Sequence, residues 1–283
     1  MATNAYPLRS AIASPPWVVV AVLLYGAAFA AWTFSAGLPM HLLQALQDAS
    51  GGWLQPTLGL ALLLGLGMLG LVFGPGRQRP GGLGWRLDAL PPALAATLLL
   101  WLAMQASTIL AACLEGVPPT WQAGWARGGM LPGALLAQLL GTALVEETVF
   151  RAWLWPQLAL QAASRVPVRW AWMLALLLSQ ALFALLHVPA RLAAGAAPAE
   201  LAGMVLALFA TGLVLALMYA ATRSLFFVVG VHALGNAPTL LFEARGPEPT
   251  MVLLAASTVF AVAWWWWHQR ADGAGVPPRT TLA

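Results

Sequence analysis

Three short clusters of polar residues interrupt otherwise apolar stretches of this sequence. The first cluster holds Glu146, Glu147 and Arg151, the second ends in His187, and the third begins at His232. In a membrane-spanning segment, each charged side chain near the bilayer centre costs roughly 2.5–3.5 kcal/mol on insertion scales. Residues that carry such a cost are candidates for function, so these clusters define the candidate site.

Helical spacing separates the two glutamates. Glu147 and Arg151 are four residues apart and lie on one helix face in the favourable acid-to-base order. We therefore expect them to neutralise each other locally, which indicates a structural role. The 3.6-residue period rotates Glu146 by about 100° from Glu147, so Glu146 points elsewhere and needs another reason to be there.

The third cluster adds a second pair at helical spacing. His232 and Asn236 are four residues apart, so their side chains converge on one face. Helix bundles build catalytic and metal sites from facing side chains on different helices. The sequence therefore predicts one site from three helices, made by Glu146, His187, His232 and Asn236.

The chemistry that these residue types support is the activation of water. A buried carboxylate such as Glu146 can act as a general base, with His187 beside it. His232 and Asn236 can then donate hydrogen bonds to an oxyanion. Two imidazoles and a carboxylate are also the ligand set of a catalytic zinc ion, here Glu146, His187 and His232, with the fourth position left for water. The sequence leaves both mechanisms open.

The composition indicates a membrane protein. Of the 283 residues, 61% are hydrophobic and 8% are charged, and the mean hydropathy is +0.80; soluble domains carry about 25% charged residues. All 13 basic residues are arginines, spread thinly along the chain. Nucleic-acid binding needs a clustered basic face, so a nucleic-acid partner is excluded. The single Cys113 excludes an intramolecular disulfide bond.

Apolar runs bounded by proline, glycine and charge predict about eight spanning helices. We expect them near 17–35, 56–73, 92–112, 131–150, 170–188, 201–221, 225–242 and 250–267. The seventh run contains Gly230, Gly235 and Pro238, which indicates bending where its backbone lines a cavity. The predicted fold is therefore an all-α, polytopic membrane bundle with an intramembrane catalytic cavity.

We expect one transmembrane domain over 1–283, and the arginines predict its orientation. If the N-terminus is cytoplasmic, nine arginines fall inside and three outside, as the positive-inside rule requires. The inside set is Arg9, Arg77, Arg79, Arg86, Arg165, Arg169, Arg223, Arg270 and Arg279, and the outside set is Arg127, Arg191 and Arg245. Both termini are then cytoplasmic. The Ala- and Arg-rich, Lys-free composition suggests a prokaryotic inner membrane.

The predicted spans leave one conflict of depth. His187 lies near the outer end of the fifth span, whereas Glu146 lies nearer the inner end of the fourth. A shared site needs both at one depth. A long fourth helix that continues past Pro156 to about Ala163 would move Glu146 towards its middle. Either a fifth span displaced outward or a break at Pro189 inside the membrane would close the remaining gap.

The three clusters together resemble the CPBP family of intramembrane proteases, also called ABI, whose eukaryotic members are the CAAX prenyl endopeptidases. The family pattern is EExxxR, then FxxxH, then HxxxN, on an all-helical membrane bundle. The matching residues are Glu146, Glu147 and Arg151, then Phe183 and His187, then His232 and Asn236. The order is the same, and the resemblance covers roughly residues 131–240.

The resemblance implies hydrolysis of a peptide bond in a membrane-embedded peptide or protein, with the lipid bilayer as surroundings. By analogy Glu146 is the general base paired with His187. His232 and Asn236 stabilise the oxyanion or help to hold a metal. A prenylated CaaX substrate is not implied, and the resemblance leaves a metalloprotease and a glutamate-dependent protease both open.

The alternative function is that of a non-catalytic transporter or scaffold. Buried Glu, Arg and His also serve as polar relays for protons or ions. Transporters often contain internal repeats with paired broken helices, and the sequence holds no second copy of the Glu-Glu or His clusters. A degenerate relative that binds a partner without cleaving it is a third alternative, against which the intact motifs argue.

Overall fold

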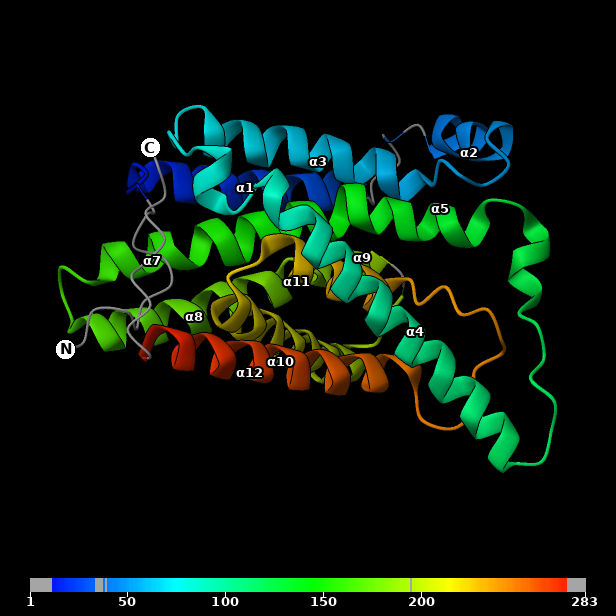
Figure 1. The fold of residues 1–283 in the computed structure, drawn as a ribbon. Coiled ribbons are helices and arrows are strands. Elements are labelled where there is room, and N and C mark those ends of the chain that lie inside the picture. Colours follow the sequence, from blue (N-terminus) through cyan, green and yellow to red (C-terminus); the bar gives the residue numbers. More distant parts are fainter. Residues whose placement is uncertain (1–11, 34–37, 39, 194, 274–283) are drawn as a thin grey trace.

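A computed structural model describes residues 12–33, 38, 40–193 and 195–273, and within them the protein is a bundle of helices without a strand (Figure 1). The α-helices are α1 (Pro16–Thr33), α2 (Met40–Ala49), α3 (Pro56–Phe73), α4 (Leu90–Leu114), α5 (Met130–Ala137), α6 (Ala143–Glu146), α7 (Trp155–Ala162), α8 (Val168–Leu185), α9 (Val188–Ala193), α10 (Pro198–Thr222), α11 (Leu225–Asn236) and α12 (Pro249–Gly273). Three short 3₁₀ turns are η1 (Pro80–Leu83), η2 (Leu87–Ala89) and η3 (Ala123–Arg127). Two π-helical segments are η4 (Gln138–Thr142) and η5 (Glu147–Leu154). Arg9 and Arg279, which the orientation argument used, lie outside the described residues.

Helices long and apolar enough to cross a bilayer make up most of the described chain. There are seven of these spans: Pro16–Thr33, Pro56–Phe73, Pro80–Leu114, Met130–Ala162, Val168–Ala193, Pro198–Thr222 and Pro249–Arg270. Large apolar side chains such as Leu66 and Leu114 stand exposed on the outside of the bundle, where lipid would cover them. The prediction of an all-α, polytopic membrane bundle is confirmed, and the chain is an integral membrane protein.

The expected span at 225–242 differs from the other seven, because only its first two thirds are helical. α11 ends at Asn236 after 12 residues, which is about 18 Å of helix against a hydrocarbon core of about 30 Å. Pro238 follows two residues later and has no N–H with which to continue the helix. The eighth crossing therefore begins as a helix and continues as non-helical chain.

This eighth crossing runs beside α4 along most of the length of that helix. Near its start, the bare backbone of Gly230 lies directly against Thr97, where any added side chain would collide. Near its end, Arg245 forms an ion pair of 3.1 Å with Glu115, which follows the last residue of α4. The helix and its non-helical continuation thus extend from one end of α4 to the other (Figure 1).

Side chains of α4 supply hydrogen bonds to the non-helical part. The Leu241 N–H donates to Gln105 Oε1 at 2.8 Å, and the Trp101 indole N–H donates to the Thr239 carbonyl at 3.2 Å. Lipid offers no hydrogen-bond partner, so non-helical backbone at membrane depth must be satisfied by protein. These two bonds allow the chain to leave the helical conformation inside the bundle.

The helix that carries the first cluster is longer than the expected span at 131–150. Met130–Ala162 forms one span of 33 residues, and Glu146 is its seventeenth residue. Pro156 does not end this helix, because it is the second residue after the π-helical segment, where the regular bonding to the fourth preceding residue is already interrupted. The long helix places Glu146 at mid-depth and thereby resolves the conflict with His187.

Replacing Gln105 by leucine tests the hydrogen-bonded support of the eighth crossing. Gln105→Leu leaves the Leu241 N–H without its acceptor, which typically costs about 1–3 kcal/mol, so the melting temperature in detergent should fall. The control Ser107→Ala, on the same helix, removes a hydroxyl that bonds only within α4 and should have a smaller effect. Equal melting temperatures for both variants would contradict this role of Gln105.

Candidate active site

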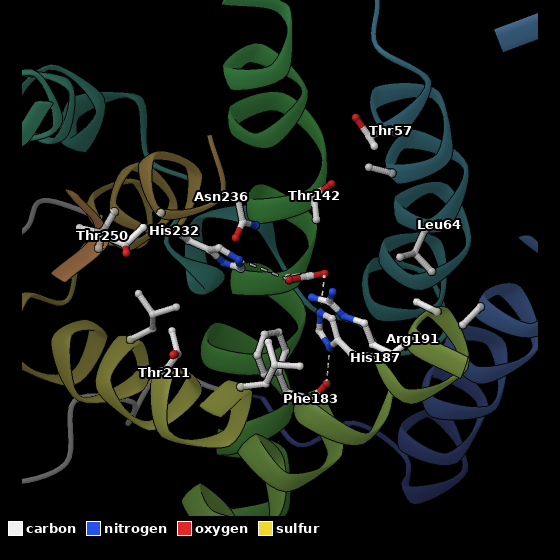
Figure 2. Close-up of a pocket in the computed structure, with 18 of the residues that line it drawn as sticks. Thr57, Leu64, Thr142, Phe183, His187, Arg191, Thr211, His232, Asn236 and Thr250 are labelled. Carbon is white, nitrogen blue, oxygen red and sulfur yellow. Dashed lines mark hydrogen bonds and ion pairs between the residues drawn. The ribbon is translucent and has the colours of Figure 1, made fainter. Parts of the chain in front are cut away.

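Polar residues from each of the three clusters meet at one cavity of about 780 Å³ inside the bundle (Figure 2). Residues from α1, α3, the long helix, α8, α9, α10, α11 and α12 line it, and most of them are apolar. The predicted site residues that line the cavity are Glu146, His187, His232 and Asn236, together with Phe183. The bundle therefore brings together the side chains that sequence spacing assigned to one site.

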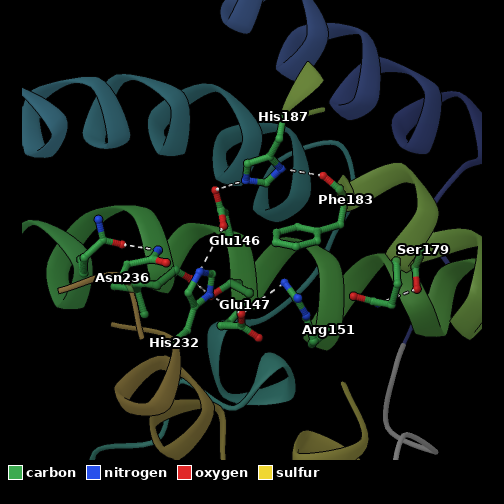
Figure 3. A network of polar contacts seen from close by, with 12 residues as sticks. Glu146, Glu147, Arg151, Ser179, Phe183, His187, His232 and Asn236 are labelled. Carbon is green, nitrogen blue, oxygen red and sulfur yellow. Dashed lines mark hydrogen bonds and ion pairs between the residues drawn. The ribbon is translucent and has the colours of Figure 1, made fainter. Parts of the chain in front are cut away.

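Glu146 lies between two imidazole rings. Its Oε1 atom is 3.9 Å from His187 Nε2, and its Oε2 atom is 3.7 Å from His232 Nε2. Each ring thus faces a different oxygen of one carboxylate (Figure 3). Both separations exceed a direct hydrogen bond, so the gaps are suited to bridging by a small polar molecule.

The turn between α8 and α9 fixes the ring of His187. α8 ends at Leu185 and α9 begins at Val188, so His187 projects from the break rather than from a helix. Its Nδ1 atom lies 2.8 Å from the Phe183 carbonyl oxygen. Because a carbonyl only accepts, Nδ1 donates there, and Nε2 faces Glu146. The break that the sequence placed at Pro189 thus lies three residues earlier.

Glu147 occupies a different environment from its neighbour. Its side chain has no exposed surface, against 14% for that of Glu146, and it does not line the cavity. Glu147 Oε1 lies 3.2 Å from Arg151 Nη1 and 2.6 Å from His232 Nδ1. The two glutamates diverge as the helical period predicts, but His232 reaches both of them, one with each ring nitrogen.

Phe183 completes the surroundings of the buried arginine. The Arg151 guanidinium carbon lies 4.2 Å from the centre of the Phe183 ring, a cation–π contact. Gly212 of α10 passes beside both, and a Cβ atom there would lie 3.2 Å from Phe183 and 3.4 Å from Arg151. Phe183, from the second cluster, therefore contacts the charged guanidinium of Arg151, from the first cluster.

Gln138 is a site residue that the sequence analysis did not identify. The Asn236 side-chain amide donates a hydrogen bond of 2.9 Å to Gln138 Oε1, and this orients the Asn236 amide group at the cavity. A signal was present, because Gln138, Thr142 and Glu146 recur every four residues and so share one helix face.

A comparison with known protein families finds one that resembles the segment containing this site. Residues 128–238 match the family model described as Type II CAAX prenyl endopeptidase Rce1-like. This segment is similar to that family, and we refer to it as the Rce1-like domain. It contains all the residues of the three motifs and extends from α5 through α11, whereas α1–α4 and α12 lie outside the match. No curated protein and no solved structure matches the chain.

The match confirms the predicted resemblance and supports a CAAX-protease-like endopeptidase. The catalytic roles of Glu146, Glu147, Arg151, His187, His232 and Asn236 stay predictions. What the geometry adds is that the Rce1-like domain arranges them in two layers: a carboxylate between two imidazoles at the cavity, and a buried ion pair behind it.

The π-helical segments lie on either side of Glu146. η4 ends four residues before it and η5 begins directly after it. Single π turns inside α-helices are frequent at functional sites, because they shift the side chains that follow around the helix axis. The 3.6-residue period used for the sequence does not contain this feature.

The predicted zinc ligands of the Rce1-like domain are Glu146, His187 and His232. Among the described residues, no group of three or more His, Cys, Asp or Glu is placed to hold a metal ion. The two imidazoles face separate oxygens of Glu146, and the second nitrogen of each ring is already bonded to protein.

The different surroundings of the two glutamates predict opposite effects on stability. Arg151→Met leaves Glu147 buried without its cation, and breaking such a pair typically costs about 3–5 kcal/mol. Thermal unfolding in detergent should show this loss, and adding Glu147→Gln to Arg151→Met should recover part of it. Glu146→Gln should change stability little, because its side chain reaches the cavity. An Arg151→Met variant as stable as Glu146→Gln would contradict the assignment.

Proposed function

We propose that this protein is an intramembrane endopeptidase that hydrolyses a peptide bond of a membrane-associated peptide or protein. The observation that carries the proposal is the carboxylate of Glu146 between two imidazoles, in a cavity at the midpoint of a membrane-spanning helix. The Rce1-like domain supports the protease class. The CAAX specificity in the family's name is not part of the proposal.

In the proposed reaction, Glu146 and His187 activate a water molecule. A water that bridges Glu146 Oε1 and His187 Nε2 donates one hydrogen to each, which directs an oxygen lone pair at the substrate carbonyl. Glu146 takes a proton as the water oxygen bonds to the carbonyl carbon. The same proton then passes to the leaving amine as the peptide bond breaks.

The third cluster stabilises the negative oxygen that forms on the substrate. Glu147 holds His232 through Nδ1, so Nε2 points to the cavity, where its protonated form donates a hydrogen bond. Asn236 donates one amide hydrogen to Gln138. Its second amide hydrogen is available for the negative oxygen of the substrate. Donors that are held in place before the reaction are the most effective stabilisers of developing charge.

The buried positive and negative charges of the site can balance each other. With His232 protonated, its charge and that of Arg151 offset those of Glu146 and Glu147. Their contacts are short enough for direct pairing at Glu147. A site with balanced charge avoids most of the cost of holding ions in a membrane interior.

Surroundings and orientation form a further part of the proposal. The apolar cavity walls suit a peptide delivered from the lipid bilayer. The Ala- and Arg-rich, Lys-free composition favours a prokaryotic inner membrane, and the arginine distribution favours both termini in the cytoplasm.

Replacing the proposed base tests the enzyme directly. Glu146→Gln keeps the shape of the side chain and removes the base, so cleavage should fall by about 10²–10⁴-fold. The assay incubates protein in liposomes with a pool of apolar peptides and identifies new termini by mass spectrometry. Glu243→Gln is the matched control, since Glu243 is exposed and does not line the cavity. Glu146-dependent ion flux without cleavage would contradict the proposal and favour a transporter.

Zinc at Glu146, His187 and His232 is a separate proposal with its own test. If these residues hold zinc, detergent-purified protein contains near-stoichiometric metal, and His187→Ala and His232→Ala both lose it. Metal content is measured by elemental mass spectrometry after zinc supplementation. Zinc-free wild-type protein that still cleaves peptides would overturn the metal proposal and leave Glu146 acting on water unaided.

A further inference from the structure

Arg191 enters the same cavity from α9 and has no place in the reaction described so far. It follows His187 by four residues, and its backbone N–H bonds to the His187 carbonyl at 3.3 Å. The two side chains therefore project from adjacent positions one helical turn apart. Arg191 lines the cavity, and Figure 2 shows its side chain extending into it on the side of His187.

The charge of Arg191 is not neutralised within the described part of the chain. Three other arginines form ion pairs there: Arg86 with Asp88, Arg151 with Glu147, and Arg245 with Glu115. No ion pair joins Arg191 to a carboxylate of the described residues. Arg191 is also the sole basic side chain other than histidine among those that line the cavity.

The composition of the cavity makes this charge conspicuous. Most lining side chains are apolar, and the one carboxylate among them is Glu146, which the proposed reaction uses as a base. Low-dielectric walls strengthen the attraction of a cation for an incoming anion. An arginine at the predicted outer end of a span also runs against the positive-inside rule, so topology does not explain it.

We propose that Arg191 binds a carboxylate of the substrate peptide and so selects peptides that carry one close to the cleaved bond. This inference rests on the proposed function and adds a substrate class to it. The arginine fork matches a carboxylate with two parallel hydrogen bonds, which a lysine does not reproduce.

The position of Arg191 limits how far that carboxylate is from the cleaved bond. Residues one turn apart have Cβ atoms about 5–6 Å apart, and an extended peptide advances about 3.3 Å per residue. The carboxylate is therefore expected within a few residues of the bond that Glu146 and His187 attack. Either a C-terminal carboxylate or an acidic side chain offers this chemistry.

Three forms of one apolar probe peptide distinguish the two sources. The first form ends in a free carboxylate, the second in an amide, and the third in an amide with one glutamate added near the C-terminus. The peptide is chosen from those that the wild-type protein cleaves in liposomes, and kcat/KM is measured for each form. Selection of the first form alone identifies the C-terminus, and selection of the third identifies a side chain.

The variant Arg191→Gln should remove this selection. A charge-assisted hydrogen bond is worth about 1.5–3 kcal/mol, so wild type should prefer a carboxylate form by about tenfold or more. Arg191→Gln should cleave all forms at the rate of the amide form. Arg191→Lys should recover part of the preference. Arg127→Gln is the matched control, because Arg127 is exposed and does not line the cavity.

Two results would overturn the inference. One is an equal rate of cleavage of all three forms by wild type; the other is an equal loss on all forms in Arg191→Gln, since Arg191 would then act on the site rather than on the substrate. Binding of fluorescent versions of the same peptides to the Glu146→Gln variant measures recognition of the substrate separately from its cleavage. Carboxylate-dependent binding that Arg191→Gln abolishes would support the inference independently of the cleavage rates.

Discussion

The structure depends on one buried carboxylate that serves two partners. Glu147 Oε1 accepts from His232 Nδ1 and pairs with Arg151 Nη1, in a part of the bundle without exposed surface. An isolated charge there would be costly, and removing one member of a buried pair exposes that cost in full. Glu147, Arg151 and His232 are therefore stable only together, and their contacts fix the long helix and α11 relative to each other.

The position of His232 in turn constrains α11. Its ring must reach Glu147 at the middle of the long helix, so α11 has to enter the bundle only as far as mid-depth. The helix ends four residues later at Asn236, whose amide is held by Gln138. The rest of the crossing is non-helical and forms hydrogen bonds with Gln105 and Trp101 of α4 and with the segment that follows α4. Gly235 and Asn236, at the end of the helix, line the cavity.

Much of the site could be predicted from spacing, because spacing on a helix is local geometry. The divergence of Glu146 from Glu147 and the convergence of His232 with Asn236 follow from the 3.6-residue period. The length of the long helix depended on whether Pro156 interrupts it, and its neighbouring π-helical segment is not encoded in hydrophobic periodicity.

Contacts between segments far apart in the chain could not be predicted from the sequence. The end of α11 depends on hydrogen bonds from α4, and the orientation of Asn236 depends on Gln138, 98 residues earlier. The Phe183 ring has a role only because the fold places Arg151 over it. The motifs predict the reacting groups, whereas the residues that hold these groups in place could be identified only from the structure.

The most direct test of the account follows the oxygen of water. Wild-type protein in liposomes is incubated with apolar peptides in ¹⁸O-enriched water, and the products are analysed by mass spectrometry. The account predicts internal cleavage, with one solvent oxygen in each newly formed C-terminal carboxyl group. Peptides that stay intact, or new termini without the solvent oxygen, would contradict hydrolysis at Glu146.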